Sequence, residues 1–90
     1  MPTLKIPTPL RPYAENQSAL TLPGEIVEEV LEGAVETYPL LKKHLFNDEG
    51  KLRPYVNVFL GEDNVKQLEG LKTPLSAEDT LLIIPSIAGG

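Results

Sequence analysis

Few side chains in this sequence are suited to covalent or metal chemistry. Cysteine is absent, which excludes disulfides, a thiolate nucleophile and cysteine-ligated metals. His44 is the only histidine, and it follows two lysines near the end of an expected helical region. Because no second ligand type clusters near it, we interpret His44 as a surface histidine whose cationic form suits the negative end of the helix dipole.

Glutamates at three- and four-residue spacing form a second candidate group, which consists of Glu28, Glu29, Glu32 and Glu36. A pair of carboxylates can act as a general acid and a general base. The same spacing is typical of the solvated face of a helix, and we adopt that interpretation.

The last four residues, Ile87-Ala88-Gly89-Gly90, form the remaining candidate. Two final glycines arise by chance with a probability of roughly 0.5%, if glycine usage is about 7%. A frayed tail or a cloning scar would also explain them, so the pair alone is weak evidence. Their position directly after an expected final strand strengthens a functional interpretation considerably.

The composition limits the partners that the chain can have. Its 90 residues fit one domain, and its formal net charge is −5. A negative surface repels phosphate backbones, so we expect no binding to nucleic acid. The charge favours a partner with a basic docking surface, although most acidic proteins are simply soluble. The N-terminal residues lack the apolar run of a signal peptide, and the longest apolar run, residues 81–84, is too short to span a bilayer. We therefore expect a soluble, cytoplasmic protein without membrane partners.

Apolar periodicity divides the chain into strands around one helical region. Apolar residues recur every three or four positions after Glu25, which predicts a helix that Pro39 ends near Tyr38. A further turn or short helix is expected before residue 46. Alternation with period two predicts strands at residues 3–6, 18–22, 55–60 and 80–84. The three prolines of residues 7–12 predict an extended or turning segment. Residues 61–64 are expected to turn, and residues 65–71 to hold a brief strand.

The order of these elements indicates an α+β roll. We expect a mixed sheet of four or five strands, with one main helix packed across one face. The first and last strands can lie side by side in the middle of the sheet as parallel neighbours. The domain is expected to comprise residues 1–84, followed by a flexible diglycine tail of residues 85–90.

Several segments resemble the ubiquitin-like sulfur carriers of the MoaD/ThiS superfamily, whose fold is the β-grasp. The resemblance covers essentially the whole chain and rests on Leu4-Lys5-Ile6-Pro7-Thr8 with Leu10-Arg11-Pro12, Tyr55-Val56-Asn57-Val58, Glu62-Asp63 and Ile84-Pro85-Ser86-Ile87-Ala88-Gly89-Gly90. The Ile-Pro-Thr start and the Pro-Ser-Ile-Ala-Gly-Gly end are most similar to CysO-type carriers, which supply sulfur for cysteine synthesis. The same tail also resembles the small subunit of molybdopterin synthase.

The resemblance implies that the chemistry takes place at the end of the chain. A partner enzyme would adenylate the Gly90 carboxylate with ATP and magnesium, and sulfur would then displace AMP to leave a thiocarboxylate. Glycine suits this role, because without a Cβ it can thread a narrow channel and leaves its carbonyl open to attack. Gly89 would let the chain approach the nucleotide, and Ile87 and Ala88 would contact the partner. The domain itself would bind no cofactor or metal and would be a cosubstrate rather than an enzyme.

The resemblance also implies a docking surface on the sheet. If the last strand alternates as in the family, Leu81 and Ile83 point at the helix, whereas Leu82 and Ile84 face away from it. Phe59 on the middle strand shares this outer face, and large apolar side chains exposed together usually mark an interface. A covering loop, or a central strand buried on both faces, would explain the same apolar run.

Three functional hypotheses remain open at this point. The first is a sulfur carrier, with an adenylating enzyme and a sulfur acceptor as partners. The acceptor would be a cysteine synthase homologue or the large subunit of molybdopterin synthase. The second is a ubiquitin-like modifier that forms isopeptide bonds through Gly90. The third is an interaction module with an idle tail, because the fold alone does not determine function.

Overall fold

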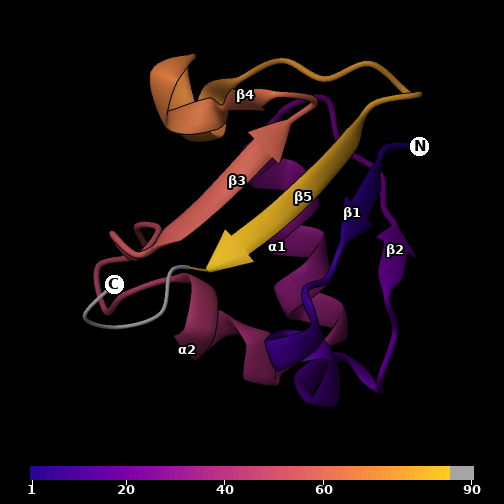
Figure 1. The fold of residues 1–90 in the computed structure, drawn as a ribbon, viewed down its shortest axis with the longest axis vertical. Coiled ribbons are helices and arrows are strands. Elements are labelled where there is room, and N and C mark those ends of the chain that lie inside the picture. Colours follow the sequence, from indigo (N-terminus) through magenta and orange to yellow (C-terminus); the bar gives the residue numbers. More distant parts are fainter. Residues whose placement is uncertain (86–90) are drawn as a thin grey trace.

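The computed structural model describes residues 1–85, which form a five-stranded sheet with a long helix packed across one face (Figure 1). The strands are β1 (Thr3–Lys5), β2 (Ala19–Thr21), β3 (Val56–Leu60), β4 (Asp63–Asn64) and β5 (Thr80–Pro85). The α-helices are α1 (Val27–Thr37) and α2 (Lys42–Leu45). Short 3-10 helices lie between them, namely η1 (Thr8–Ala14), η2 (Pro39–Leu41), η3 (Val65–Gln67) and η4 (Gly70–Lys72). The predicted α+β class and mixed sheet are confirmed.

Strand β5 lies at the centre of the sheet, whose order is β2-β1-β5-β3-β4. It pairs in parallel with β1, where Leu81 is opposite Leu4, and antiparallel with β3, where Ile83 is opposite Val58. The first and last strands are therefore parallel neighbours, as predicted. Parallel neighbours need a long crossover connection, and the chain between β1 and β5, including α1, provides it.

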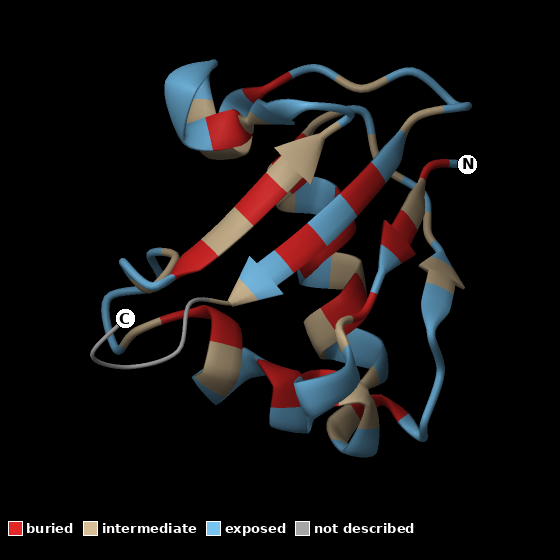
Figure 2. Ribbon diagram, viewed as in Figure 1, coloured by how far each residue is buried: buried red, intermediate tan, exposed pale blue. Residues whose placement is uncertain are grey.

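The core lies between α1 and the side of the sheet that faces it. Leu81 and Ile83 of β5 and Val56 and Val58 of β3 are fully buried on this side. Figure 2 shows the resulting alternation of buried and exposed positions along β5. One face of α1 closes the core with four buried residues at helical spacing, Val27, Val30, Leu31 and Ala34.

Helix α1 begins at Val27 rather than at Glu25, and it ends where Pro39 predicts. Before the first turn, the backbone N–H of Glu25 donates a hydrogen bond to Oε1 of Glu29 at 2.7 Å. Acidic side chains here also face the positive end of the helix dipole. Pro39 disfavours the helical conformation of the preceding residue, and Tyr38 has left it with a ψ of 83°. The chain then continues into η2 and α2, the further turn expected from the sequence.

The expectation that residues 7–12 are extended or turning is wrong, because residues 8–14 form η1. Pro9 lies in the first turn, where a backbone N–H has no partner within the helix in any case. Pro12 removes one further donor, but the N–H of Leu10 still bonds to the carbonyl of Pro7 at 2.9 Å. Burial of Leu10 and Ala14 against the core stabilises these turns.

Residues 61–71 also differ from the predicted turn and brief strand. The strand is β4, which lies within the expected turn, and η3 and η4 follow it. Gly61 permits the early reversal, because its φ of +64° is a conformation that favours glycine. The side chain of Asn64 then accepts a hydrogen bond from the N–H of Lys66 at 2.9 Å and so begins η3. Elements this short carry too little periodicity to be recognised in a sequence.

Gly24 lies where the chain entering α1 passes close to the helix. A Cβ at this position would lie 2.8 Å from Cγ2 of Val30 and 3.1 Å from its backbone nitrogen. We expect Gly24→Ala to lower the free energy of unfolding by about 1–3 kcal/mol, the usual cost of overpacking. Urea denaturation followed by circular dichroism measures the change.

Gly33→Ala is the matched control within α1. A Cβ at Gly33 meets only the side chain of Leu22, at 3.6 Å or more, which is ordinary contact. Alanine is also preferred over glycine inside a helix by about 1 kcal/mol. We therefore expect this variant to be neutral or stabilised, and an equal loss in both variants would contradict the steric explanation.

Candidate functional site

The side of the sheet that faces away from α1 exposes two large aliphatic side chains of β5. Leu82 is 38% exposed and Ile84 is 41% exposed, whereas Leu81 and Ile83 are fully buried. The predicted alternation along the last strand is confirmed. The exposure also excludes the two alternative explanations, a covering loop and burial on both faces, for the described residues 1–85.

Strand pairing determines the neighbours of these side chains. Leu82 is opposite Lys5 of β1 and Phe59 of β3, and Ile84 is opposite Asn57. Directly opposed side chains lie on the same face of a sheet and contact each other, so Leu82 and Phe59 form an adjacent pair. Phe59 is half-buried and presents less surface than Leu82. The structure therefore brings together the three predicted strand members of the docking surface, whose docking role stays a prediction.

A groove of about 460 Å³ lies beside Leu82 and Ile84 and extends to the end of β5 at Pro85. Residues of β1, β2 and the start of η1 line its other side. Lys5 and Arg11 are the charged residues in this lining. The groove therefore combines exposed aliphatic groups with two cations.

Sequence reasoning missed both cations of the groove. Lys5 could have been found, because the alternation that buries Leu4 and Ile6 places Lys5 on the outer face. Arg11 could not, because its position depends on η1. There its Nε–H donates a hydrogen bond to the carbonyl of Ile6 at 3.0 Å, which holds the guanidinium beside the groove.

The predicted tail residues Ile87, Ala88, Gly89 and Gly90 lie outside the described residues. The chain enters the tail from β5, which continues through Pro85 opposite Val56 and is one residue longer than expected. The division into a domain of residues 1–84 and a flexible tail stays a prediction.

His44 is less exposed than the predicted surface histidine. Its ring is half-buried and stacks on Tyr13 of η1, with ring centroids 4.1 Å apart and an interplanar angle of 28°. Its Nε2 is buried and has no hydrogen-bond partner within residues 1–85. Desolvation first, and then the charges of Lys43 and Arg53, lower the pKa of His44. The ring is therefore neutral at pH 7 and packs α2 against η1.

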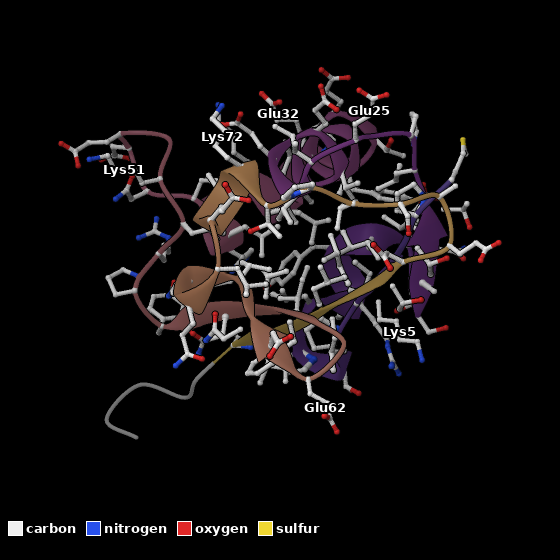
Figure 3. The ribbon with its side chains drawn as sticks, turned by 90° about the horizontal axis from the view of Figure 1, so that it is seen from above. Lys5, Glu25, Glu32, Lys51, Glu62 and Lys72 are labelled. Carbon is white, nitrogen blue, oxygen red and sulfur yellow. The ribbon has the colours of Figure 1, made fainter. Side chains whose placement is uncertain are left out.

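The glutamates of α1 form the solvated helix face that we expected. Figure 3 shows Glu25, Glu32 and Lys72 on the α1 side of the molecule. Glu28 pairs with Nζ of Lys72 at 2.7 Å, an interaction that raises the pKa of Lys72.

Within residues 1–85, no group of three or more histidine or acidic side chains could hold a metal ion. The same part of the chain contains no helix that is long and apolar enough to cross a membrane.

Comparison with known proteins assigns the chain to a family. The model of the ThiS family matches residues 4–90, which is nearly the whole chain. The chain belongs to the ThiS family. Its sheet and its crossing helix are the ubiquitin-like β-grasp, so the predicted superfamily and fold are confirmed.

Relatives of this ThiS-family chain include named sulfur carriers and named modifiers. The sulfur carrier protein CysO of Mycobacterium tuberculosis is 30% identical over 90 residues, which cover 98% of this chain and 97% of that protein. A chain in the crystal structure of the Amycolatopsis orientalis BexX/CysO complex superposes with a TM-score of 0.90 at 30% identity, with both chains fully covered. Small archaeal modifier protein 1 from Methanosarcina acetivorans superposes with a TM-score of 0.85 at 32% identity, over 99% of this chain and 95% of that one.

The packing of His44 predicts a loss of stability in mild acid. Folding lowers its pKa, so the unfolded chain binds a proton more readily than the folded chain. Stability is therefore complete above the unfolded value of about 6.5 and falls as the pH drops through it toward the folded value. We expect the urea midpoint to decrease between about pH 7.5 and about pH 5.5.

The variant His44→Phe isolates this contribution, because phenylalanine can keep the stacking on Tyr13 but cannot titrate. Its urea midpoint should change less over the same pH range, because the variant contains no histidine. Identical pH profiles for the two proteins, or a pKa of His44 above its ordinary value in an NMR titration, would contradict the proposed packing effect.

Proposed function

We propose that this ThiS-family protein is a sulfur carrier that holds sulfur as a thiocarboxylate on Gly90 and delivers it for cysteine biosynthesis in the cytoplasm. The observation that carries the proposal is the family match, which continues through residue 90 and includes both glycines. Similarity to CysO over the full length of both proteins supports the assignment to cysteine rather than to molybdopterin.

The proposed reaction has two steps, both catalysed by an adenylating partner. The Gly90 carboxylate attacks the α-phosphorus of magnesium-bound ATP, pyrophosphate leaves, and an acyl adenylate forms. The sulfur of a hydrosulfide ion then attacks the carbonyl carbon, the bond from that carbon to the AMP oxygen breaks, and a proton is lost. The products are AMP and the thiocarboxylate, whose sulfur is the nucleophile passed to an acceptor such as a cysteine synthase homologue. No change of oxidation state is needed.

In this proposal the domain supplies docking and the partner supplies catalysis. Leu82 and Ile84 are exposed on the strand that leads into the tail. A fully extended chain from Pro85 to Gly90 reaches at most about 17 Å. The partner's docking site for the end of β5 and its active site can therefore be no farther apart than this distance. Exposed aliphatic groups beside an aromatic one, here Phe59, are suited to the desolvated centre of such an interface.

A second candidate function is protein modification through an isopeptide bond between Gly90 and a target lysine. It is favoured by similarity to proteins named as modifiers, including 34% identity over 64 residues to small archaeal modifier protein 3 of Haloferax volcanii. Both candidates pass through the same acyl adenylate. They differ in the nucleophile that attacks it, which is sulfide in one case and a lysine amine in the other.

Intact mass spectrometry tests the proposal and separates the two candidates. The purified chain is incubated with its adenylating enzyme, ATP, magnesium and sulfide. We expect a mass gain equal to the replacement of one oxygen atom by sulfur. Larger adducts on other proteins, without that gain, would favour modification.

The variant that lacks Gly90 is the chemical control for this experiment. It ends at Gly89 and keeps every described residue, so we expect it to fold normally and to gain no sulfur. The unreacted wild-type mass also establishes whether the polypeptide ends at Gly90. Charging of the truncated variant to the same extent as the wild type would end the sulfur-carrier proposal.

The docking role of the exposed strand residues is tested separately. Replacing both Leu82 and Ile84 by alanine removes large side chains that the fold leaves partly exposed, so stability should change little. We expect the KM of the adenylating enzyme for the carrier to rise by at least about tenfold, because a few well-packed side chains near the centre of an interface carry most of its binding energy.

Leu68→Ala is the matched control for the docking experiment, because Leu68 is 44% exposed but follows η3 rather than lying on the outer sheet face. Its KM should remain within about twofold of the wild type. Equal KM values for the double variant and the wild type would show that the partner docks elsewhere.

A further inference from the structure

The groove beside Leu82 and Ile84 has a charge opposite to that of the whole protein. The chain has 13 acidic residues and a net charge of −5, yet none of the acidic side chains within residues 1–85 lines this groove. Among the described residues, the charged members of the lining are Lys5 and Arg11. A basic surface on an acidic protein attracts negatively charged groups locally, although the net charge of the protein would suggest the opposite.

The acidic residues are concentrated on other parts of the molecule. Figure 3 shows Lys5 projecting on the side of the molecule opposite to Glu25 and Glu32, which lie on the α1 side. Glu62 projects toward the sheet side in the same view, but it lies in the turn between β3 and β4. That turn adjoins the beginning of β5, where Leu60 is opposite Leu81, whereas the groove reaches its end at Pro85.

The two cations are free to bind an external group. Lys5 is exposed, and within residues 1–85 its ammonium makes no hydrogen bond or ion pair. Arg11 is half-buried and uses Nε for the carbonyl of Ile6, so its terminal Nη groups remain available. A guanidinium held in this way is suited to a carboxylate, because its fixed donors match the carboxylate geometry.

We propose that the groove binds an acidic segment of the adenylating enzyme, with aliphatic side chains of that segment on Leu82 and Ile84 and an Asp or Glu between Lys5 and Arg11. The inference rests on the proposed function, because it assigns a chemistry to the partner of the same docking surface. It replaces the expectation of a basic partner, which followed from net charge alone. Complementary charge at the rim of an apolar contact fixes its register and accelerates association.

Charge reversal of the groove tests this inference. In the double variant Lys5→Glu, Arg11→Glu we expect the Kd for the adenylating enzyme, measured by fluorescence anisotropy without ATP, to rise about tenfold or more. The KM for charging should rise in parallel while kcat is unchanged. The wild-type Kd should rise as NaCl increases from about 50 mM to about 500 mM. The Kd of the double variant should stay constant or fall over the same range, because salt screens the repulsion between its glutamates and the acidic segment.

Lys51→Glu is the matched control, because Lys51 is also exposed and is not part of the groove lining. Figure 3 shows Lys51 and Lys5 on opposite sides of the molecule. Its Kd should remain within about twofold of the wild type. Lys5→Glu alone is the second variant, because it retains the Arg11 hydrogen bond and cannot be discounted as misfolded. Circular dichroism melting verifies that each variant folds.

The outcomes separate this inference from the proposed function. Equal Kd values for the wild type, the double variant and Lys5→Glu would overturn the acidic-segment inference even if the wild type gains sulfur. Tighter binding of the double variant would show that the partner is basic, which also overturns it. Binding without sulfur transfer would contradict the carrier function, and the comparison of Kd values would still test the acidic-segment inference. Absence of both binding and charging would overturn both.

Discussion

The position of β5 between β1 and β3 is the constraint on which the rest of this structure depends. Leu81 is opposite both Leu4 of β1 and Leu60 of β3, so one strand connects the beginning of the chain to its later half. Because side chains alternate along a strand, this register buries Leu81 and Ile83 and turns Leu82 outward. A slip of one residue would reverse this arrangement and lose both the core and the candidate docking surface.

The same constraint relates the core to the proposed chemistry. α1 covers one face of the sheet, so the small domain completes its hydrophobic core on that side alone. Within residues 1–85 the outer face has no second layer, and Leu82 and Ile84 are partly exposed. Since β5 is also the last described element, the core and the proposed docking surface share one strand. A partner bound at β5 could position the residues after Pro85 without a conformational change in the domain.

The parts of the fold that follow period two or period 3.6 could be predicted from sequence. Strands β1, β2, β3 and β5, the main helix and the outward orientation of Leu82 and Ile84 belong to this class, because burial on one side imposes a repeat on the residues. The errors fall where conformation depends on distant contacts. η1 forms despite Pro9 and Pro12 because Leu10 is buried. His44 has lysine neighbours in sequence but a tyrosine ring in space, which no local pattern records.

Net charge does not describe the local charge of the candidate docking surface, for a related physical reason. It sums over the whole chain, whereas a docking partner responds to charges within about one Debye length, roughly 8 Å at physiological salt. The exposed face of α1 carries four glutamates, whereas the lining of the sheet groove within residues 1–85 includes Lys5 and Arg11 and no carboxylate side chain. Within residues 1–85, the acidic face of α1 and the two cations beside the exposed aliphatic residues therefore lie on different parts of the molecule.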